Sequence, residues 1–421
     1  MNKKTLYILF ITVLINMIGL GIIIPFVPII FKLKNFFPQG YSATDINIVL
    51  GLLLAAYPFA QFFGAPLLGK LSDNYGRKRI LSLSLLGSFT GYLLFALGIY
   101  LSSLSLLFVS RLIDGFTGGN ISVAMASIAD ISTDEKSKVR NFGLIGAAFG
   151  LGFIIGPAIG GILSDTQISP LFTTLTPFLG ASFFALINLL YVYFKLPETL
   201  EHRLKNRISI KGSFVNLKIA FTFPGLKTIF YALFWVNLGW VLFEYFFQVF
   251  LFGKFHFTAS NIAYLFVYIG FWIVLSQGYI VRKVSNSIEA SKALKIALLP
   301  ASVLLMVIVF VNKEALYFVL PLMAIFMGFS QPNFSALLSE HTEKDSQGEI
   351  LGIRQSVISL SQFLAPLAGG FLLNAGNSLE KGYQVPLIAG SVLVFFGWLF
   401  VLAVRIPKRK ISFNFDKNAI S

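Results

Sequence analysis

The chain contains no cysteine, and its three histidines, His202, His256 and His341, are scattered along it. The absence of cysteine excludes disulfides and thiolate metal ligands. Scattered histidines argue against a metal centre or a histidine-based catalytic site, and no Gly-x4-Gly-Lys-Ser/Thr loop is present to hold a nucleotide phosphate. We therefore expect no metal, no cofactor, no ATP-driven step and no enzyme activity.

Charge is also scarce, because 12% of the residues are charged while 56% are hydrophobic, and the mean hydropathy is +0.80. So few polar side chains cannot cover a soluble protein of this length, which makes lipid the solvent for most of the chain. A net charge of +15 would indicate a nucleic-acid ligand in a soluble protein. Here the basic residues lie in short loops between apolar runs, so we expect membrane lipid and no nucleic acid as a partner.

Apolar runs of roughly 20 residues, the length that crosses a bilayer, recur along the chain. We predict twelve spanning helices, over residues 5–31, 46–69, 80–101, 104–129, 140–163, 172–195, 226–252, 260–281, 291–311, 315–338, 348–374 and 384–404. Most of the 33 Lys and Arg residues fall in loops on one side, and the exceptions on the other side are Lys32, Lys34, Lys254, Lys313 and Lys381. The positive-inside rule therefore places both termini in the cytoplasm.

The chain repeats itself at half its length. Gly156–Leu163 matches Ala365–Leu372, and the same offset carries Gly143 to Gly352. Such duplications place a binding site near mid-membrane, between the two halves. We predict an all-α membrane protein made of two pseudo-symmetric six-helix bundles, residues 1–195 and 226–405, joined by a cytoplasmic linker over 196–225 and followed by a cytoplasmic tail over 406–421.

The loop between the second and third predicted spans is Gly69–Arg79, with the sequence Gly-Lys-Leu-Ser-Asp-Asn-Tyr-Gly-Arg-Lys-Arg. It resembles motif A of the major facilitator superfamily, the membrane transporters in which that motif occupies this same loop. The resemblance implies a conformational latch made of Gly69, Asp73, Gly76, Arg77 and, at the end of the fourth span, Asp130. A basic loop is expected from topology alone, but topology does not require the two glycines and the aspartate at these places.

The fifth predicted span carries small residues at intervals of four, together with a proline. The candidate packing and hinge residues are Gly146, Gly150, Gly156, Pro157, Gly160 and Gly161. Small residues at this spacing let helix backbones approach closely, and Pro157 bends the helix, so the surface could slide against the other half. The pattern resembles motif C, the signature of drug and tetracycline antiporters with twelve spans, although such spacings are also common in ordinary helix packing.

The first predicted span contains Asn16–Pro28, which resembles motif D of the same exporters. In that motif an aspartate usually stands where this chain has Asn16. An amide does not exchange a proton near neutral pH, so proton coupling through this position is in doubt. Asn16 is a candidate to hydrogen-bond a substrate in the central cavity, and the alternative is an asparagine that packs against another helix.

The fourth predicted span holds Arg111 and Asp114, three residues apart and therefore on one helix face. The segment Arg111–Asn120 resembles motif B, whose arginine is implicated in proton transfer in the family. A guanidinium beside Asp114 keeps the carboxylate ionised, and a movement that separates the two would let it take up a proton. The alternative is a permanent ion pair that only neutralises two buried charges. Asn120, at the end of the segment, is a second cavity candidate.

Glu244 lies in the seventh predicted span, in one stripe with Asn237 and Gln248. An unpaired carboxylate at depth could bind a proton or a cationic substrate, unless it lies close enough to the outer surface to be solvated. Gln331 in the tenth span adds a neutral hydrogen-bonding group. We therefore take Asp114, Arg111 and Glu244 as proton-coupling candidates, and Asn237, Gln248 and Gln331 as further cavity candidates. Arg354, near the cytoplasmic end of the eleventh span, could simply be an anchor.

Taken together, these motifs identify the chain as similar to the drug:proton antiporter and tetracycline-resistance branch of the superfamily. The resemblance implies a monomeric transporter of the bacterial inner membrane that exports a small amphipathic organic molecule by alternating access, driven by proton entry. The 46 phenylalanines and 15 tyrosines supply aromatic faces for such a substrate. The departure at Asn16 keeps an alternative open, a proton-independent or import-type carrier of a metabolite or siderophore. A membrane protein that does not transport, such as a receptor or an assembly partner, is a further alternative.

Overall fold

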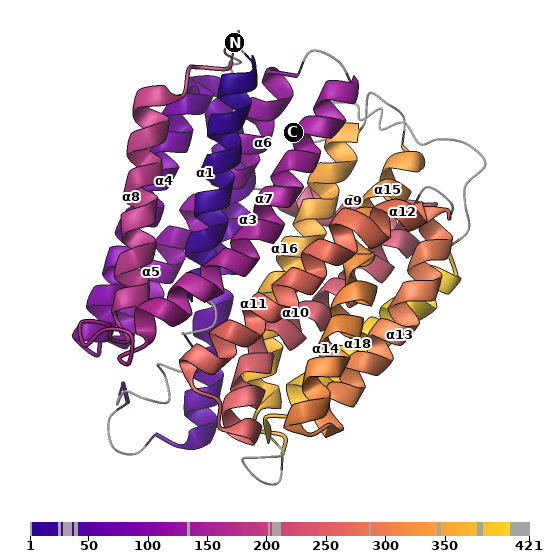
Figure 1. The fold of residues 1–421 in the computed structure, drawn as a ribbon. Coiled ribbons are helices and arrows are strands. Elements are labelled where there is room, and N and C mark those ends of the chain that lie inside the picture. The colour runs from indigo at the N-terminus through magenta and orange to yellow at the C-terminus, as the bar shows by residue number, and fades with distance from the viewer. Residues whose placement is uncertain are drawn as a thin grey trace.

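The computed structural model describes residues 2–23, 27, 36–37, 41–132, 135–200, 203, 212–285, 288–342, 347–376 and 382–404. These residues form helices without strands, in two groups that stand side by side in Figure 1. The first group comprises α1 (Asn2–Ile23), α3 (Ala43–Tyr75), α4 (Arg77–Tyr100), α5 (Leu104–Thr117), α6 (Asn120–Asp130), α7 (Glu135–Ser164) and α8 (Thr176–Lys195).

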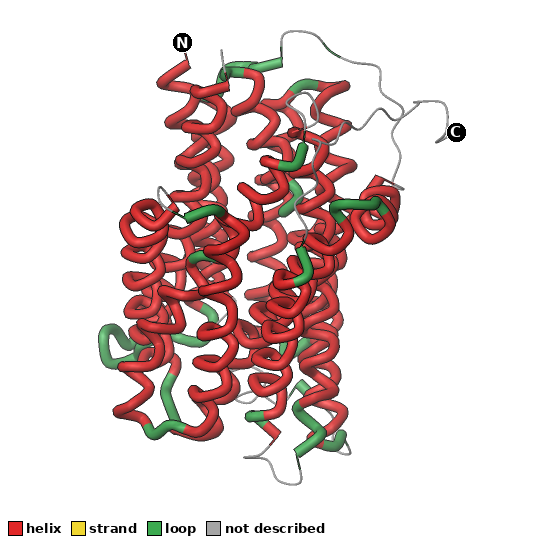
Figure 2. Tube along the Cα trace, turned by 90° about the vertical axis from the view of Figure 1, so that its right-hand side faces the viewer, coloured by secondary structure: helices red, strands yellow, loops and turns green. Residues whose placement is uncertain are grey.

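The second group comprises α10 (Lys227–Phe255), α11 (Ala259–Leu275) continued by the π-helix η1 (Ser276–Val281), α12 (Arg282–Ser285), α13 (Ala290–Phe310), α14 (Lys313–Gly328), α15 (Ser330–Glu340), α16 (Gln347–Leu372) and α18 (Val385–Leu402). Within the first group α1 packs along α7 and α8, and α4 packs along α5 and α8. Within the second group α10 packs along α16 and α18, and α13 along α14 and α18. The same helical arrangement is visible from the side in Figure 2.

Ten described helical stretches are long and apolar enough to cross a membrane. They correspond to ten of the twelve predicted spans. The other two predicted spans, 104–129 and 140–163, coincide with α5 and α6 together and with α7. The predicted all-α membrane fold is therefore confirmed, and every predicted span has a helical counterpart.

Two predicted spans are interrupted, which the sequence did not indicate. The fourth span breaks between α5 and α6 at Gly118 and Gly119, and the tenth breaks between α14 and α15 at Phe329. A Cβ on Gly119 would lie 2.5 Å from the backbone nitrogen of Ala65, and one on Gly115 would meet the backbone of Tyr57. The first break therefore lies where α3 approaches the fourth span too closely for any side chain. An unbroken apolar run does not reveal such a contact.

The predicted linker also contains structure that was not expected, the helix α9 (Gly212–Thr222). Pro66 in α3 lacks an N–H, so the helix offers the carbonyl of Phe62 no partner four residues on. The buried hydroxyl of Ser213 donates to that carbonyl at 2.9 Å, and Asn216 Nδ2 donates to Ser356 Oγ of α16 at 3.1 Å. A helix of 11 residues is marginal alone, so these contacts with both groups are what hold it.

The two groups also meet directly, at the end of the bundle opposite the N-terminus. We call this end the far side and the end that carries the N-terminus, at the top of Figure 1, the terminal side. On the far side Asn47 donates to Asn374 at 2.9 Å, and Ser260 donates to Asp165 at 2.9 Å. A Cβ on Gly51 would lie 2.6 Å from the carbonyl oxygen of Pro366. The α3–α16 and α7–α11 contacts thus hold the far side together.

Candidate functional site

The ion pair predicted in the fourth span is present. Arg111 Nη2 lies 3.2 Å from Asp114 Oδ2, and the two side chains are 6% and 1% exposed. The guanidinium carbon also lies 4.6 Å from the centre of the Phe95 ring, a cation–π contact from α4. Gly91 of α4 permits this approach, because a Cβ there would lie 2.7 Å from Asp114 Cβ.

The hydrogen bonding of this pair is incomplete. Among the described residues, Arg111 Nε and Nη2 and Asp114 Oδ2 have no hydrogen-bond partner. A buried pair with unsatisfied hydrogen-bonding atoms is held by charge more than by directed bonds. Removing either partner would leave the other charge uncompensated.

Each half contains an amide pair that joins its first span to its interrupted fourth span. In the first half Asn16 Nδ2 donates to Asn120 Oδ1 at 2.8 Å, and in the second half Gln331 Nε2 donates to Asn237 Oδ1 at 2.8 Å. Asn120 begins α6 and Gln331 is the second residue of α15, so both pairs lie directly after the helix breaks. The sequence pattern indicated these four residues separately as cavity candidates and did not pair them.

The pairing bears on the two interpretations of Asn16. Its side chain is 7% exposed and bound to another helix, which is the interhelical packing alternative. Asn120 Nδ2 nevertheless has no partner among the described residues. One buried N–H at the break of the fourth span is therefore free to bind another acceptor.

In the second half the amide pair extends to a cation. Arg354 Nη2 of α16 donates to Gln331 Oε1, and Asn237 Nδ2 donates to the carbonyl of Leu233 at 2.8 Å. Arg354 is therefore part of a network across α16, α15 and α10 and not only an anchor near a helix end. Within the described chain its Nε has no partner, and no carboxylate contacts it.

Glu244 lies nearer the middle of α10 than either end, with intermediate exposure. The described residues give its carboxylate neither a hydrogen bond nor an ion pair. Gln248, one turn on, is buried; its Nε2 donates to the carbonyl of Glu244 at 3.2 Å, while its Oε1 has no partner in the described chain. The stripe predicted on this helix therefore holds an uncompensated carboxylate and a buried acceptor.

The predicted latch residues gather at the terminal side around Arg77. Its Nε lies 2.8 Å from Asp130 Oδ2 of α6, and its Nη1 lies 2.6 Å from Asp73 Oδ1 and donates to Ser72 Oγ at 2.7 Å. The Arg77–Asp130 pair expected from the family is therefore present. Asp73, also predicted in the latch, is the second carboxylate paired with Arg77. Gly69 lies one turn before Asp73 in α3, and a Cβ added to Gly69 would have room.

Glu198, from the segment after α8, is part of this cluster and was not predicted from the sequence. Its Oε1 accepts the backbone N–H of Arg77 at 2.9 Å and those of Thr199 and Leu200 at 3.0 and 3.1 Å. Gly76 makes room for it, since its φ is +102° and a Cβ there would meet the Glu198 carboxylate. Nothing in the spacing of the chain links Glu198 to the distant loop that carries Gly76 and Arg77.

The glycines of α7 pack differently from the expectation. Gly152 and Gly156 lie against Met17 and Gly21 of α1, in the same half. Gly161 approaches Ala263 of α11 in the other half, while a Cβ on Gly150 would meet nothing within 4 Å. Pro157 and Gly160 are buried, and the surroundings of Gly146 lie outside the described residues. Gly152 and Gly156 thus belong to a contact within the first half, and Gly161 belongs to a contact with the second half.

Within the described part of the chain, no group of three or more His, Cys, Asp or Glu side chains could hold a metal ion. The polar groups of the site instead divide between two buried clusters, one in each half, and an ionic cluster at the terminal side. Buried charges inside apolar spans mark ion or substrate pathways. This arrangement defines a multi-pass membrane protein of the transporter class.

Comparison with known proteins agrees with this class. The Major Facilitator Superfamily profile matches residues 9–320 and 285–419, so the chain belongs to this family of small-molecule transporters. It is 27% identical over 420 residues to the tetracycline resistance protein, class B, of Escherichia coli, covering 97% of this chain and 99% of that protein. It is 28% identical over 401 residues to multidrug resistance protein 2 of Bacillus subtilis (strain 168), covering 93% and 94%.

Among solved structures, the D-xylose–proton symporter superposes with a TM-score of 0.75 at 15% identity, covering 94% of this chain and 97% of that one. At this identity the likeness concerns the fold alone. It supports the all-α transporter fold that the helices of this chain form.

Proposed function

We propose that the protein is a secondary active transporter that exports a small amphipathic organic molecule, in exchange for protons that enter the cell. The observation that carries the proposal is the buried Arg111–Asp114 pair with its unsatisfied hydrogen-bonding atoms. The relatives that this chain matches over nearly their whole length are named for tetracycline and multidrug resistance. Proton-driven efflux requires a buried group whose charge changes during the cycle, and in this proposal the pair supplies one.

The proton enters at Asp114 in this proposal. Arg111 holds the carboxylate ionised while the two are in contact, and a movement of α5 against α4 that separates them favours protonation. Asn16 cannot take this role, because it is an amide bound to Asn120. Glu244 supports the exchange from the second half, where no described cation neutralises it.

The substrate binds between the halves in this proposal, at the level of the two helix breaks. The side-chain amide nitrogen of Asn120, which has no partner among the described residues, supplies a donor there. The unpaired Oε1 of Gln248 supplies an acceptor about three helical turns beyond Asn237 along α10.

We place the protein in the bacterial inner membrane as a monomer surrounded by lipid, with both termini in the cytoplasm. The terminal side is then the cytoplasmic side, and the Arg77 cluster stabilises the first half there. In this proposal the first half ends at residue 195 and the second half runs from residue 226 to residue 405. The proton gradient alone supplies the energy for transport.

The test uses everted vesicles from cells that produce the protein, with uptake of a fluorescent drug driven by an imposed pH gradient. Asp114→Asn should lower pH-driven uptake at least tenfold, because the proton carrier is gone. Glu314→Gln, an equal change at an exposed acid, should leave uptake unchanged. Equal transport by Asp114→Asn and the parent would show that the proton does not enter through Asp114.

A second candidate is a proton-independent or import-type carrier, which the Asn16–Asn120 amide pair favours because it offers the first span no titratable group. Counterflow of a preloaded substrate in vesicles would separate the two. A rate that stays constant when the pH gradient is collapsed would favour the second candidate over proton-driven export.

A further inference from the structure

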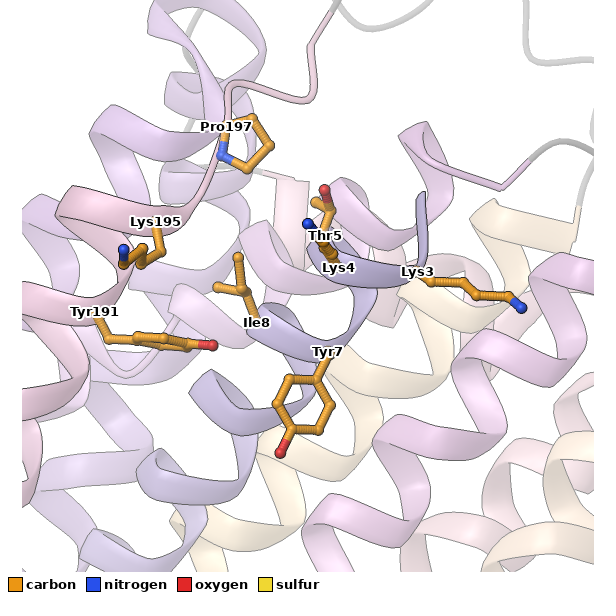
Figure 3. A pocket seen from close by; sticks show the side chains of 8 residues that line it. All are labelled: Lys3, Lys4, Thr5, Tyr7, Ile8, Tyr191, Lys195 and Pro197. Atoms are coloured by element: carbon orange, nitrogen blue, oxygen red, sulfur yellow. The ribbon is translucent and has the colours of Figure 1, made fainter. Parts of the chain in front are cut away.

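A surface cavity lies between α1 and α8 at the terminal side, away from the polar clusters of the site (Figure 3). It has a volume of about 630 Å³ and is lined by Lys3, Lys4, Thr5, Tyr7, Ile8, Tyr191, Lys195 and Pro197. Helix α1 begins here and α8 ends here, so the cavity lies at the depth where the apolar part of the bundle meets its polar end.

The charge of this cavity is of one sign. Lys4 and Lys195 lie on opposite helices at its rim, Lys3 is on the same turn as Lys4, and no carboxylate lines it. All three ammonium groups belong to exposed side chains and have no ion pair among the described residues. The cavity therefore presents uncompensated positive charge.

Two acidic groups of the terminal side, among the described residues, are already engaged. Glu198 follows Pro197 directly, but its Oε1 accepts three backbone N–H groups. Asp130 is paired with Arg77. The lysines of the cavity are thus left for an anion from outside the protein.

The floor and the outer wall of the cavity are apolar and aromatic. In Figure 3 the ring of Tyr191 extends from α8 toward α1, where Ile8 lies, and Tyr7 lies below on α1. Tyr7 is 60% exposed, and on the last turns of α8 Tyr193 and Phe194 are 59% and 70% exposed. Exposed aromatic residues at the ends of spanning helices are typical of the membrane interface.

We propose that this cavity binds an anionic phospholipid, with the headgroup phosphate between Lys4 and Lys195 and an acyl chain along Tyr7 and Tyr191. Basic pockets between spanning helices on the side of the anionic leaflet recognise such headgroups, and each lysine near the surface adds to the attraction. Inorganic phosphate offers the same anion without the acyl chain, so the apolar wall is what selects the lipid.

The experiment is native mass spectrometry of the purified full-length protein in detergent. Three probes are compared at equal concentration: dioleoyl phosphatidylglycerol, the zwitterionic dioleoyl phosphatidylethanolamine, and inorganic phosphate. The parent protein should retain phosphatidylglycerol in preference to both other probes. In Lys4→Gln/Lys195→Gln the apparent affinity for phosphatidylglycerol should fall on the order of tenfold.

The matched control is Lys227→Gln/Lys292→Gln, which removes the same charge from exposed positions of the second half. It should bind phosphatidylglycerol as the parent does. Equal retention of phosphatidylglycerol by the two double variants would overturn the proposal, and so would inorganic phosphate or phosphatidylethanolamine binding as tightly as phosphatidylglycerol. If Lys4→Gln/Lys195→Gln does not elute as folded protein, Lys195→Gln alone should still show a loss of about threefold, and no loss would count against the site.

Discussion

The two halves share a geometry but treat buried charge differently. Each half has an interrupted fourth span and an amide pair that joins it to the first span. The first half adds a cation and an anion that neutralise each other, Arg111 and Asp114. The second half adds an arginine held by an amide, Arg354, and a carboxylate on another helix, Glu244, which the described residues leave unpaired.

The difference shows that duplication preserved the backbone arrangement while the charges diverged. The first half can change its charge state only by breaking a contact between neighbours on one helix. The second half carries its charges apart, on α16 and α10. Substitutions of like residues in the two halves should therefore have unequal effects.

The largest difference is expected for the two arginines. Arg111→Met would leave Asp114 buried without its cation, which should lower the free energy of unfolding by about 3–5 kcal/mol. Arg354→Met should have a smaller effect, about 1–2 kcal/mol, because it leaves the Gln331 amide oxygen without this donor but leaves no carboxylate without a cation. Thermal unfolding in detergent measures both, and Arg111→Met/Asp114→Asn should recover part of the loss. Equal losses for the two single variants would contradict the comparison.

The amide pairs give the next difference. Gln331→Ala removes a partner from both Asn237 and Arg354, so it should lower stability by about 2–3 kcal/mol. Asn120→Ala removes a partner from Asn16 alone and should cost about 1–2 kcal/mol. The same unfolding assay compares the two variants. A larger loss for Asn120→Ala would mean that Gln331 does not stabilise Asn237 and Arg354 together.

The glycines test the close contacts of the first half. A methyl group on Gly119 would press on the backbone of Ala65, so Gly119→Ala should cost about 1–3 kcal/mol. A Cβ on Gly352 in the second half would meet nothing within 4 Å, so Gly352→Ala should be neutral or stabilise by up to about 1 kcal/mol. A stabilising Gly119→Ala would show that α3 and the fourth span are not in tight backbone contact.

The smallest effect is expected at α9, which belongs to neither half. Ser213→Ala leaves the carbonyl of Phe62 without a donor and should cost about 1 kcal/mol. Phe214→Ala on the same helix removes ring contacts with Phe62 and Phe63 of α3 instead, and serves as a comparison for lost packing. Protection of the α9 amides in hydrogen exchange should fall in Ser213→Ala, and unchanged protection would argue that the helix is held by other contacts.

Sequence reasoning went furthest where local chemistry decides the outcome. The Arg111–Asp114 contact follows from a spacing of three on one helix, and the Arg77–Asp130 contact follows from a loop pattern typical of the family. The reasoning stopped where contacts join distant segments. Glu198, the pairing of Asn16 with Asn120, the inclusion of Arg354 in a network, and the helix α9 each depend on which surfaces meet, and no spacing along the chain reports that.

The amino-acid sequence by itself determined that lipid surrounds most of the chain, that its apolar runs form helices, and which side chains carry charge into the apolar region. These properties follow from hydrophobic length and from the energy of burying charge, and both are additive along a chain. Only the tertiary structure decided that Glu198 and Arg354 join polar clusters, where two spans break, and which carbonyl the Ser213 hydroxyl binds. Those outcomes depend on the close approach of backbones at glycines and prolines, and that approach exists only once the helices have packed together.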